Sequence, residues 1–132
     1  MIHADIELRN AANPGLKPLP VKALVDTGMA HLCIPRHVAL QLGLTICDQR
    51  EVVISDGTTV VVDYVGPIGI GFGKRRAFVG ALVIGEEVLL GMIPLSDLDL
   101  VIEPRSGKVS VNPESPNIPL SGSLPPSLGV TH

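Results

Sequence analysis

The sequence predicts an all-β domain, a sandwich or barrel of short strands with one short helix. Apolar residues make up 45% of the 132-residue chain and aromatic residues only 2%, so the core must be built from aliphatic side chains. The 14 glycines and 12 prolines indicate frequent turns. Short β-rich runs recur at regular spacing, which is typical of sandwiches and barrels. A chain of this length suits one domain with a single core.

Three extended segments are predicted in the first part of the chain. Apolar and polar residues alternate over 2–8, the pattern of a half-buried strand. Asn, Pro and Gly predict a loop over 10–20. The apolar runs 21–25 and 31–35 predict the second and third segments.

A short helix is predicted after the third segment. Pro35 suits the first turn of a helix, because an N–H at that position has no helical partner to lose. The run 38–42 continues the helix, and Gly43 suits the position just past its end.

An Asp-Gly pair between two β-branched runs predicts a hairpin in the middle of the chain. Its strands are residues 51–54 and 58–65, and its turn is Ser55-Asp56-Gly57. The remaining predicted elements are strands at 66–72, 76–84 and 88–90, a helical turn at 94–98, and a second hairpin that pairs 100–103 with 109–111.

The composition changes after residue 111, where Pro, Ser, Gly and Asn become frequent. Such a segment has too little apolar surface to order itself. The predicted organisation is therefore one domain over 1–111 and a flexible Pro/Ser-rich tail over 112–132.

Charge and targeting patterns argue against several classes of function. The net charge is −3, and the basic cluster at 74–76 is assigned to a solvated hairpin turn, so nucleic acid is not an expected partner. Asp97 and Asp99 are placed in another solvated turn.

No apolar run approaches the ~18 residues of a membrane helix, and the first residues lack the pattern of a signal peptide. We therefore expect a cytoplasmic protein without a membrane partner.

The cysteine and histidine positions predict neither a disulfide nor a metal site. Cys33 and Cys47 both lie in apolar surroundings, and we expect free, mostly buried thiols. The four histidines show no metal-type spacing with them, so no metal and no other cofactor is predicted. His31 is interpreted as a surface or hydrogen-bonded polar residue, because nothing supplies a matching nucleophile.

The most informative motif is Asp26-Thr27-Gly28, which directly follows the apolar run 21–25. An isolated buried carboxylate is costly, so an acid at the end of a buried strand needs a role. Gly28 permits a tight turn and offers a backbone N–H, and Thr27 offers a hydroxyl that can lock the loop. Two such carboxylates brought together would form an acid–base pair. This chain carries one copy of the motif.

Three elements in this order resemble the retroviral-type aspartic proteases (retropepsins, clan AA) and their single-domain bacterial-type relatives. After the Asp-Thr-Gly, the hairpin around Asp56-Gly57 resembles the family's flap. Leu89-Leu90-Gly91 resembles the element that closes the active-site loop. The resemblance covers about residues 2–111 and implies an acid-protease half-barrel, closed or partly open, of short antiparallel strands. Each subunit of the family contributes one Asp, which implies a homodimer with an isologous interface.

The resemblance also implies a reaction, aspartic endopeptidase activity on a peptide or unfolded-protein substrate. Asp26 and its copy in the partner would share one proton; the ionised carboxyl activates a water, and the protonated one polarises the substrate carbonyl. By resemblance, Thr27 and Gly28 support the active-site loop. The predicted flap and substrate contacts are Met29, Ile54, Asp56, Gly57 and Leu89, and the predicted structural residues are Leu90 and Gly91.

Two other interpretations remain open at this stage. Relatives commonly carry Ala or Ser after Asp-Thr-Gly and often Asp or Ser next, whereas this chain has Met29 and Ala30. A catalytically inactive peptide-binding or dimerisation module on the same fold is therefore the main alternative, since fold does not imply activity. In the third interpretation the domain is a plain β-barrel scaffold, and Asp26 only caps a turn.

Overall fold

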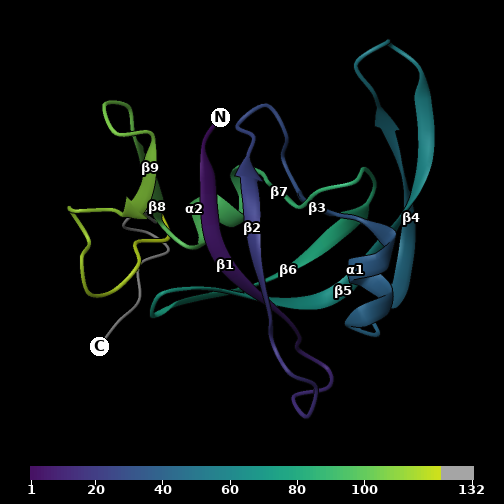
Figure 1. The fold of residues 1–132 in the computed structure, drawn as a ribbon, viewed down its shortest axis with the longest axis horizontal. Helices are drawn as coiled ribbons and strands as arrows, with labels where there is room; N and C mark the ends of the chain where they lie inside the picture. The colour runs from purple at the N-terminus through teal and green to yellow at the C-terminus, as the bar shows by residue number, and fades with distance from the viewer. Residues whose placement is uncertain (123–132) are drawn as a thin grey trace, which may run out of the picture.

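The computed structural model describes residues 1–122, and the last ten residues of the predicted tail lie outside the described part. Figure 1 shows the arrangement of its strands and helices. The elements are β1 (His3–Asn10), β2 (Leu19–Val25), β3 (Leu32–Ile34), α1 (Arg36–Gln41), β4 (Thr45–Val53), β5 (Thr59–Phe72), β6 (Arg75–Val83), β7 (Leu89–Leu90), α2 (Met92–Asp97), β8 (Leu100–Glu103) and β9 (Lys108–Val111).

Six strands form a closed barrel in the order β1-β2-β7-β3-β6-β5, and pairing between β1 and β5 completes the ring. β4 pairs with β5 outside this ring, and β8 and β9 form a separate two-stranded sheet. The predictions of an all-β fold and of a barrel are thus confirmed. Most pairings are antiparallel, but β2–β7 and β3–β6 are parallel.

Several predicted boundaries differ from the structure, and β4 begins at Thr45 rather than at the predicted residue 51. The runs predicted as separate strands at 58–65 and 66–72 are one long strand, β5, with a register shift where it pairs with β6. The predicted loop at 10–20 is shorter, because β1 extends to Asn10 and pairs there with Ile68. The predicted helical turn at 94–98 is a second short helix, α2, so the domain has two helices rather than one.

The first helix follows its sequence signals closely. Pro35 is the N-cap of α1, and Gly43 adopts φ +61° just beyond the C-cap, a left-handed conformation that glycine tolerates best. The Asn10 side chain donates to the carbonyls of Leu42 and Gly43 at 2.9 and 3.2 Å. A buried amide thus satisfies the helix end and ties it to β1.

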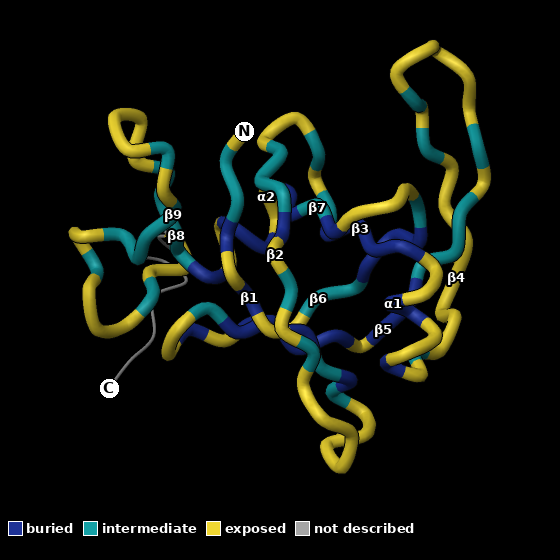
Figure 2. Tube along the Cα trace, in the orientation of Figure 1, coloured by how far each residue is buried: buried dark blue, intermediate teal, exposed yellow. Residues whose placement is uncertain are grey.

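The core is aliphatic, as predicted, and is formed by the barrel strands together with α1 and α2 (Figure 2, dark blue). Its fully buried side chains include Leu8, Leu32, Ile34, Leu42, Ile68, Ile70, Leu90 and Leu98. No helix in residues 1–122 has the length and apolar character required to cross a membrane.

Two residues predicted in solvated turns form a partly buried ion pair instead. The Arg75 side chain is 5% exposed, lies 3.8 Å from the Asp99 carboxylate, and donates to the carbonyl of Leu98 at 3.1 Å. Asp99 also accepts hydrogen bonds from Asn112 at 3.1 Å and from the hydroxyl of Ser115. A buried guanidinium needs such partners, because an unpaired buried charge is strongly destabilising.

The same network binds the first part of the predicted tail. Ser115 contacts both Asp99 and Arg75, and the backbone N–H of Leu120 donates to Asp99 at 2.8 Å. These bonds lower the pKa of Asp99 to about 2, with the Ser115 hydroxyl as the largest cause. Residues 112–122 are therefore attached to the domain, which the composition alone did not indicate.

The lowered pKa of Asp99 predicts a pH-dependent stability. A carboxylate of this kind stabilises the fold above its unfolded pKa of about 4 and loses that contribution as the pH falls toward about 2. Wild type should therefore have a larger free energy of unfolding than Asp99→Asn at neutral pH, with the difference shrinking between about pH 4 and pH 2. Urea unfolding measures this, with exposed Asp5→Asn as control; a difference independent of pH would contradict the prediction.

Candidate active site

The position of Asp26 is fixed by a parallel pairing between β2 and β7. Leu24 is in register with Leu89, and Val25 with Leu90. The backbone N–H of Asp26 continues this ladder by donating to the carbonyl of Leu90 at 3.1 Å. Asp26 is therefore the first residue after β2, and its backbone is hydrogen-bonded to β7.

A tight turn holds the Asp26 carboxylate. The N–H of Gly28 donates to its Oδ1 at 2.9 Å, and the N–H of Met29 donates to its backbone carbonyl at 3.2 Å. Asp26 is half-buried, while Thr27 and Gly28 are exposed. The carboxylate is thus oriented by the loop backbone while the loop itself faces outward.

Gly91 allows the active-site loop to pack directly on the start of α2. The N–H groups of Met92 and Ile93 donate to the carbonyls of Met29 and Ala30, both at 2.8 Å. A side-chain carbon at Gly91 would lie 2.4 Å from the carbonyl oxygen of His31 and 2.5 Å from that of Met29. Only a glycine fits between these backbones, so the Leu-Leu-Gly element and the Asp-Thr-Gly loop form one unit.

The two cysteines differ in their surroundings. Cys33 lies on β3, is fully buried, and is opposite Leu89. Burial raises the pKa of its thiol to about 11, and the negative charge of Asp26 contributes. Such a thiol stays protonated at neutral pH and is a poor nucleophile. Cys47 is free and exposed, so the prediction of mostly buried thiols is wrong for Cys47.

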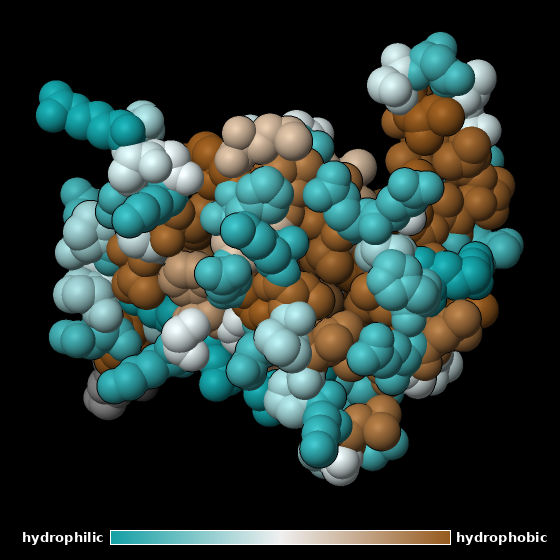
Figure 3. All heavy atoms as spheres, in the orientation of Figure 1, coloured by the Kyte–Doolittle hydropathy of each residue, from teal (hydrophilic) through white to brown (hydrophobic). Residues whose placement is uncertain are grey.

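The predicted flap is the hairpin of β4 and β5, which stands apart from the Asp26 loop (Figure 1). Its sides are apolar below a polar tip (Figure 3), and Val53 and Val61 are largely exposed. At the tip, Asp56 accepts bonds from the backbone and hydroxyl of Thr58 at 2.8 and 2.6 Å. These bonds lower the pKa of Asp56, chiefly through the hydroxyl, so the tip carries a negative charge.

The other predicted site residues fall into two groups. Met29 and Leu89 are half-buried and belong to the unit around Asp26, whereas Ile54, Asp56 and Gly57 lie on the hairpin. Within one chain, the tip of the β4–β5 hairpin is separated from the loop that follows β2 (Figure 1). Among residues 1–122 no cluster of three or more His, Cys, Asp or Glu side chains is suited to hold a metal.

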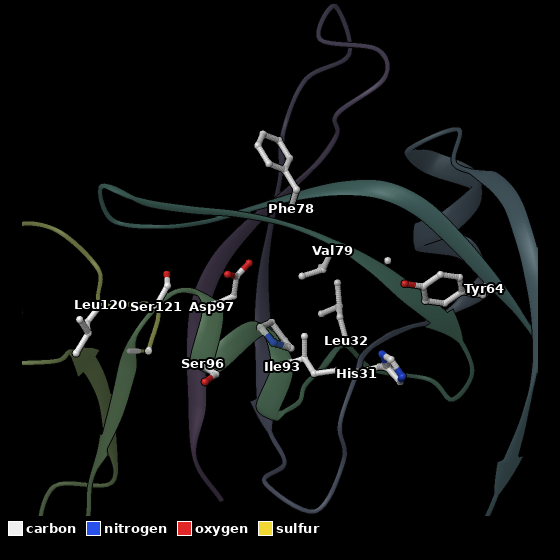
Figure 4. A pocket seen from close by; sticks show the side chains of 13 residues that line it. His31, Leu32, Tyr64, Phe78, Val79, Ile93, Ser96, Asp97, Leu120 and Ser121 are labelled. Atoms are coloured by element: carbon white, nitrogen blue, oxygen red, sulfur yellow. The ribbon is translucent and has the colours of Figure 1, made fainter. Parts of the chain in front are cut away.

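Two grooves flank α2, and only one reaches the Asp-Thr-Gly loop. The first, of about 680 Å³, lies between α2 and β6, with His31 and Tyr64 at one end and Leu120 at the other (Figure 4). His31 packs edge-on against Tyr64 with ring centres 6.0 Å apart, and the lining does not include Asp26. This groove is therefore separate from the predicted catalytic group.

The second groove, of about 350 Å³, contains Thr27. Its other walls are Met92 and Leu95 of α2, the strand β8, and Leu120. Sequence reasoning missed that β8 and residue 120 lie beside the active-site loop, because nothing local to either segment encodes this tertiary contact. The apolar run 100–102 predicts a strand, but it does not show that this strand lies next to the active-site loop.

Comparisons with known proteins identify a family and a similar fold. A family model described as aspartyl protease matches residues 13–109. No curated protein matches the sequence. Among solved structures, the retroviral protease-like domain of Ddi1 from Leishmania major is similar with a TM-score of 0.55 and 12% identity, over 86% of this chain and 90% of that chain. At this identity the similarity concerns the fold alone.

The close approach at Gly91 predicts a strong effect of one added methyl group. Gly91→Ala should lower the free energy of unfolding by about 3 kcal/mol, because two backbone carbonyls must move to admit it. Gly15→Ala is the matched control, since its new carbon would meet Asn13 at an ordinary 3.5 Å. Chemical denaturation measures both variants, and equal stabilities would contradict this view of the loop.

The two thiols should differ sharply in reactivity. In native protein at mildly alkaline pH, a thiol reagent should label Cys47 rapidly and leave Cys33 unmodified, because Cys33 is buried and its pKa is raised. Labelling in denaturant should reach both. Mass spectrometry of the labelled peptides assigns the sites, and rapid native labelling of Cys33 would count against the burial described here.

Proposed function

Because the chain belongs to the aspartyl protease family, which its sequence matches over residues 13–109, we propose that it is an aspartic endopeptidase whose site forms between two copies. Asp26 is the catalytic group contributed by each copy. The observation that carries the proposal is the held carboxylate, with Asp26 fixed by β7 on one side and by the N–H of Gly28 on the other. The proposal includes the cytoplasmic location and peptide substrate expected from the sequence.

The need for two copies follows from the chemistry. One chain carries one Asp-Thr-Gly, and a single carboxylate cannot be both the base and the acid in the same step. Two Asp26 carboxylates placed close together cannot both ionise readily, so they hold one proton between them. The pair thereby supplies an ionised and a protonated carboxyl at the same pH.

The reaction then requires only these groups and a water. The ionised Asp26 takes a proton from the water, whose oxygen bonds to the carbonyl carbon of the peptide. The protonated Asp26 of the other copy gives its proton to the carbonyl oxygen, which produces a tetrahedral diol. The Asp26 that took the proton of the water then gives it to the amide nitrogen, while the other Asp26, now ionised, takes a proton from one hydroxyl of the diol. The C–N bond breaks, an amine and a carboxylic acid are released, and the pair again holds one proton.

In this proposal the residues around Asp26 orient its carboxylate and contact the partner chain and the substrate. Gly28 orients the carboxylate, and Thr27, exposed on the loop, is available to the loop of the partner. Met29 and Leu89 lie beside Asp26 and offer apolar contacts to a substrate. The β4–β5 hairpin, with Ile54 near its tip, would close over an extended peptide and exclude water.

The decisive variant is Asp26→Asn, which keeps the shape of the side chain and removes its acid–base function. We expect wild type to cleave a denatured protein at acidic pH, with inhibition by a pepstatin-type compound, and the variant to lose about 10²-fold or more of the rate. Exposed Asp5→Asn should keep the wild-type rate. Peptide release between about pH 3 and pH 8 is the measurement.

The outcomes separate the proposed protease from the alternatives. Equal inactivity of wild type and Asp26→Asn, with both proteins folded and dimeric, would favour the inactive peptide-binding or dimerisation module. A rate unaffected by Asp26→Asn would reject Asp26 as the catalytic group. A rate maximum above neutral pH would contradict the shared proton.

A further inference from the structure

The groove between α2 and β6 takes no part in the proposed reaction, yet exposed apolar side chains gather around it. We call it the α2–β6 groove. Three of the large apolar side chains that the fold leaves exposed belong to its lining residues, namely Phe78 at 73%, Leu120 at 63% and Ile93 at 46%. Exposed apolar side chains that gather at a hollow, unlike those scattered singly, indicate a binding surface.

The walls of this groove are apolar and already in place. Val79 of β6 and Ile93 of α2 lie on opposite sides of it, and Tyr64 stands at one end (Figure 4). A side-chain carbon at Gly80 would lie 2.2 Å from Cζ of Tyr64, so the ring packs directly on the backbone of β6. The guanidinium of Arg50 lies over the ring, 4.3 Å from its centre. A wall fixed in this way loses little freedom when it binds.

The chain itself reaches the other end of the groove. We call residues 113–122 the strap. Asp99 holds the strap, because the hydroxyl of Ser115 and the N–H of Leu120 both donate to its carboxylate. Residues 120–122 then line the α2–β6 groove. The ten residues that follow in the sequence therefore start at this groove.

The composition of the next residues suits a groove of this kind. Residues 124–128, which we call the proline segment, read Leu-Pro-Pro-Ser-Leu. Consecutive prolines favour polyproline II, which is ordered before it binds and is recognised by aromatic-lined grooves. Its carbonyls are acceptors for a donor such as the Tyr64 hydroxyl. The segment carries no charge, and among residues 1–122 the groove lining includes one carboxylate, Asp97, and no Lys or Arg.

The proline segment is long enough to follow the groove. The six residues of α2 span ~9 Å at the helical rise, and five residues of polyproline II span ~15 Å. Because the strap holds the start of the segment at the groove, its effective concentration there is on the order of millimolar. A contact too weak to join two separate molecules is therefore sufficient to dock it.

We propose that the proline segment binds in the α2–β6 groove of its own chain, with its Leu and Pro side chains against Tyr64, Val79 and Ile93. The lining of this groove does not include Asp26. The inference therefore goes beyond the proposed function and does not depend on it. Docking there would join the end of the chain to α2 and β6 and cover apolar surface that residues 1–122 leave exposed.

A disulfide trap in the full chain tests this proposal. Cys47→Ser removes the exposed thiol, and Ser96→Cys with Leu124→Cys places one thiol in the groove and one in the proline segment. Ser96 lies between Leu120 and Ile93 along the groove (Figure 4). Under mild oxidation we expect a disulfide within one chain, since this bond requires Cα atoms within about 7 Å.

Matched variants separate docking from mere tethering. Adding Ile93→Ser leaves the tether unchanged and removes an apolar contact, so it should slow the disulfide about 10-fold. Adding Leu40→Ser, on α1 and 72% exposed, should leave the rate unchanged. Circular dichroism verifies that each variant is folded, and intact mass without reductant distinguishes a bond within one chain from a bond between two.

Each outcome decides the proposal. A disulfide within one chain that is slowed by Ile93→Ser and not by Leu40→Ser supports it, whether or not the protein cleaves peptides. An equal rate with Ile93→Ser would show that tethering alone brings the thiols together and would overturn it. Disulfides only between chains would place the segment on another copy, and no disulfide would leave the groove to a different occupant; either result overturns the proposal.

Discussion

The parallel pairing of β2 with β7 is the interaction on which the rest of the site depends. It places Asp26 at the end of a strand inside a closed barrel and supplies the carbonyl of Leu90 to its backbone. Gly91, the next residue, then lets the loop after Asp26 lie against α2 with no side chain between the two backbones. Two segments more than sixty residues apart in the chain thereby act as one rigid support for a carboxylate.

The second organising contact is the pair of Arg75 and Asp99. It is buried enough to need full hydrogen bonding, and its partners come from the end of α2, from the residues after β9 and from the strap. Removing either charge would leave the other poorly compensated in a region of low solvent access. The contact joins the barrel to the C-terminal sheet, so the two parts are positioned relative to each other by charge as well as by packing.

The sequence was most informative where local chemistry decides the structure. The β4–β5 hairpin follows from its Asp-Gly turn, the first helix from Pro35 and Gly43, and the turn after β2 from Asp26-Thr27-Gly28, because each signal acts within a few residues. The errors concern tertiary contacts. Arg75 and Asp99 looked like solvated residues because nothing in their neighbourhoods shows that they meet.

The barrel closes without β4, whose one strand neighbour in residues 1–122 is β5. The closed ring has no free edge at which to open, whereas β4 can separate from its neighbour without breaking any bond of the ring. The molecule therefore combines a closed ring of strands, which carries the carboxylate, with a strand, β4, that has a single strand neighbour in residues 1–122. None of the backbone bonds that hold Asp26 involves β4, so a displacement of this strand would leave the support of the carboxylate unchanged.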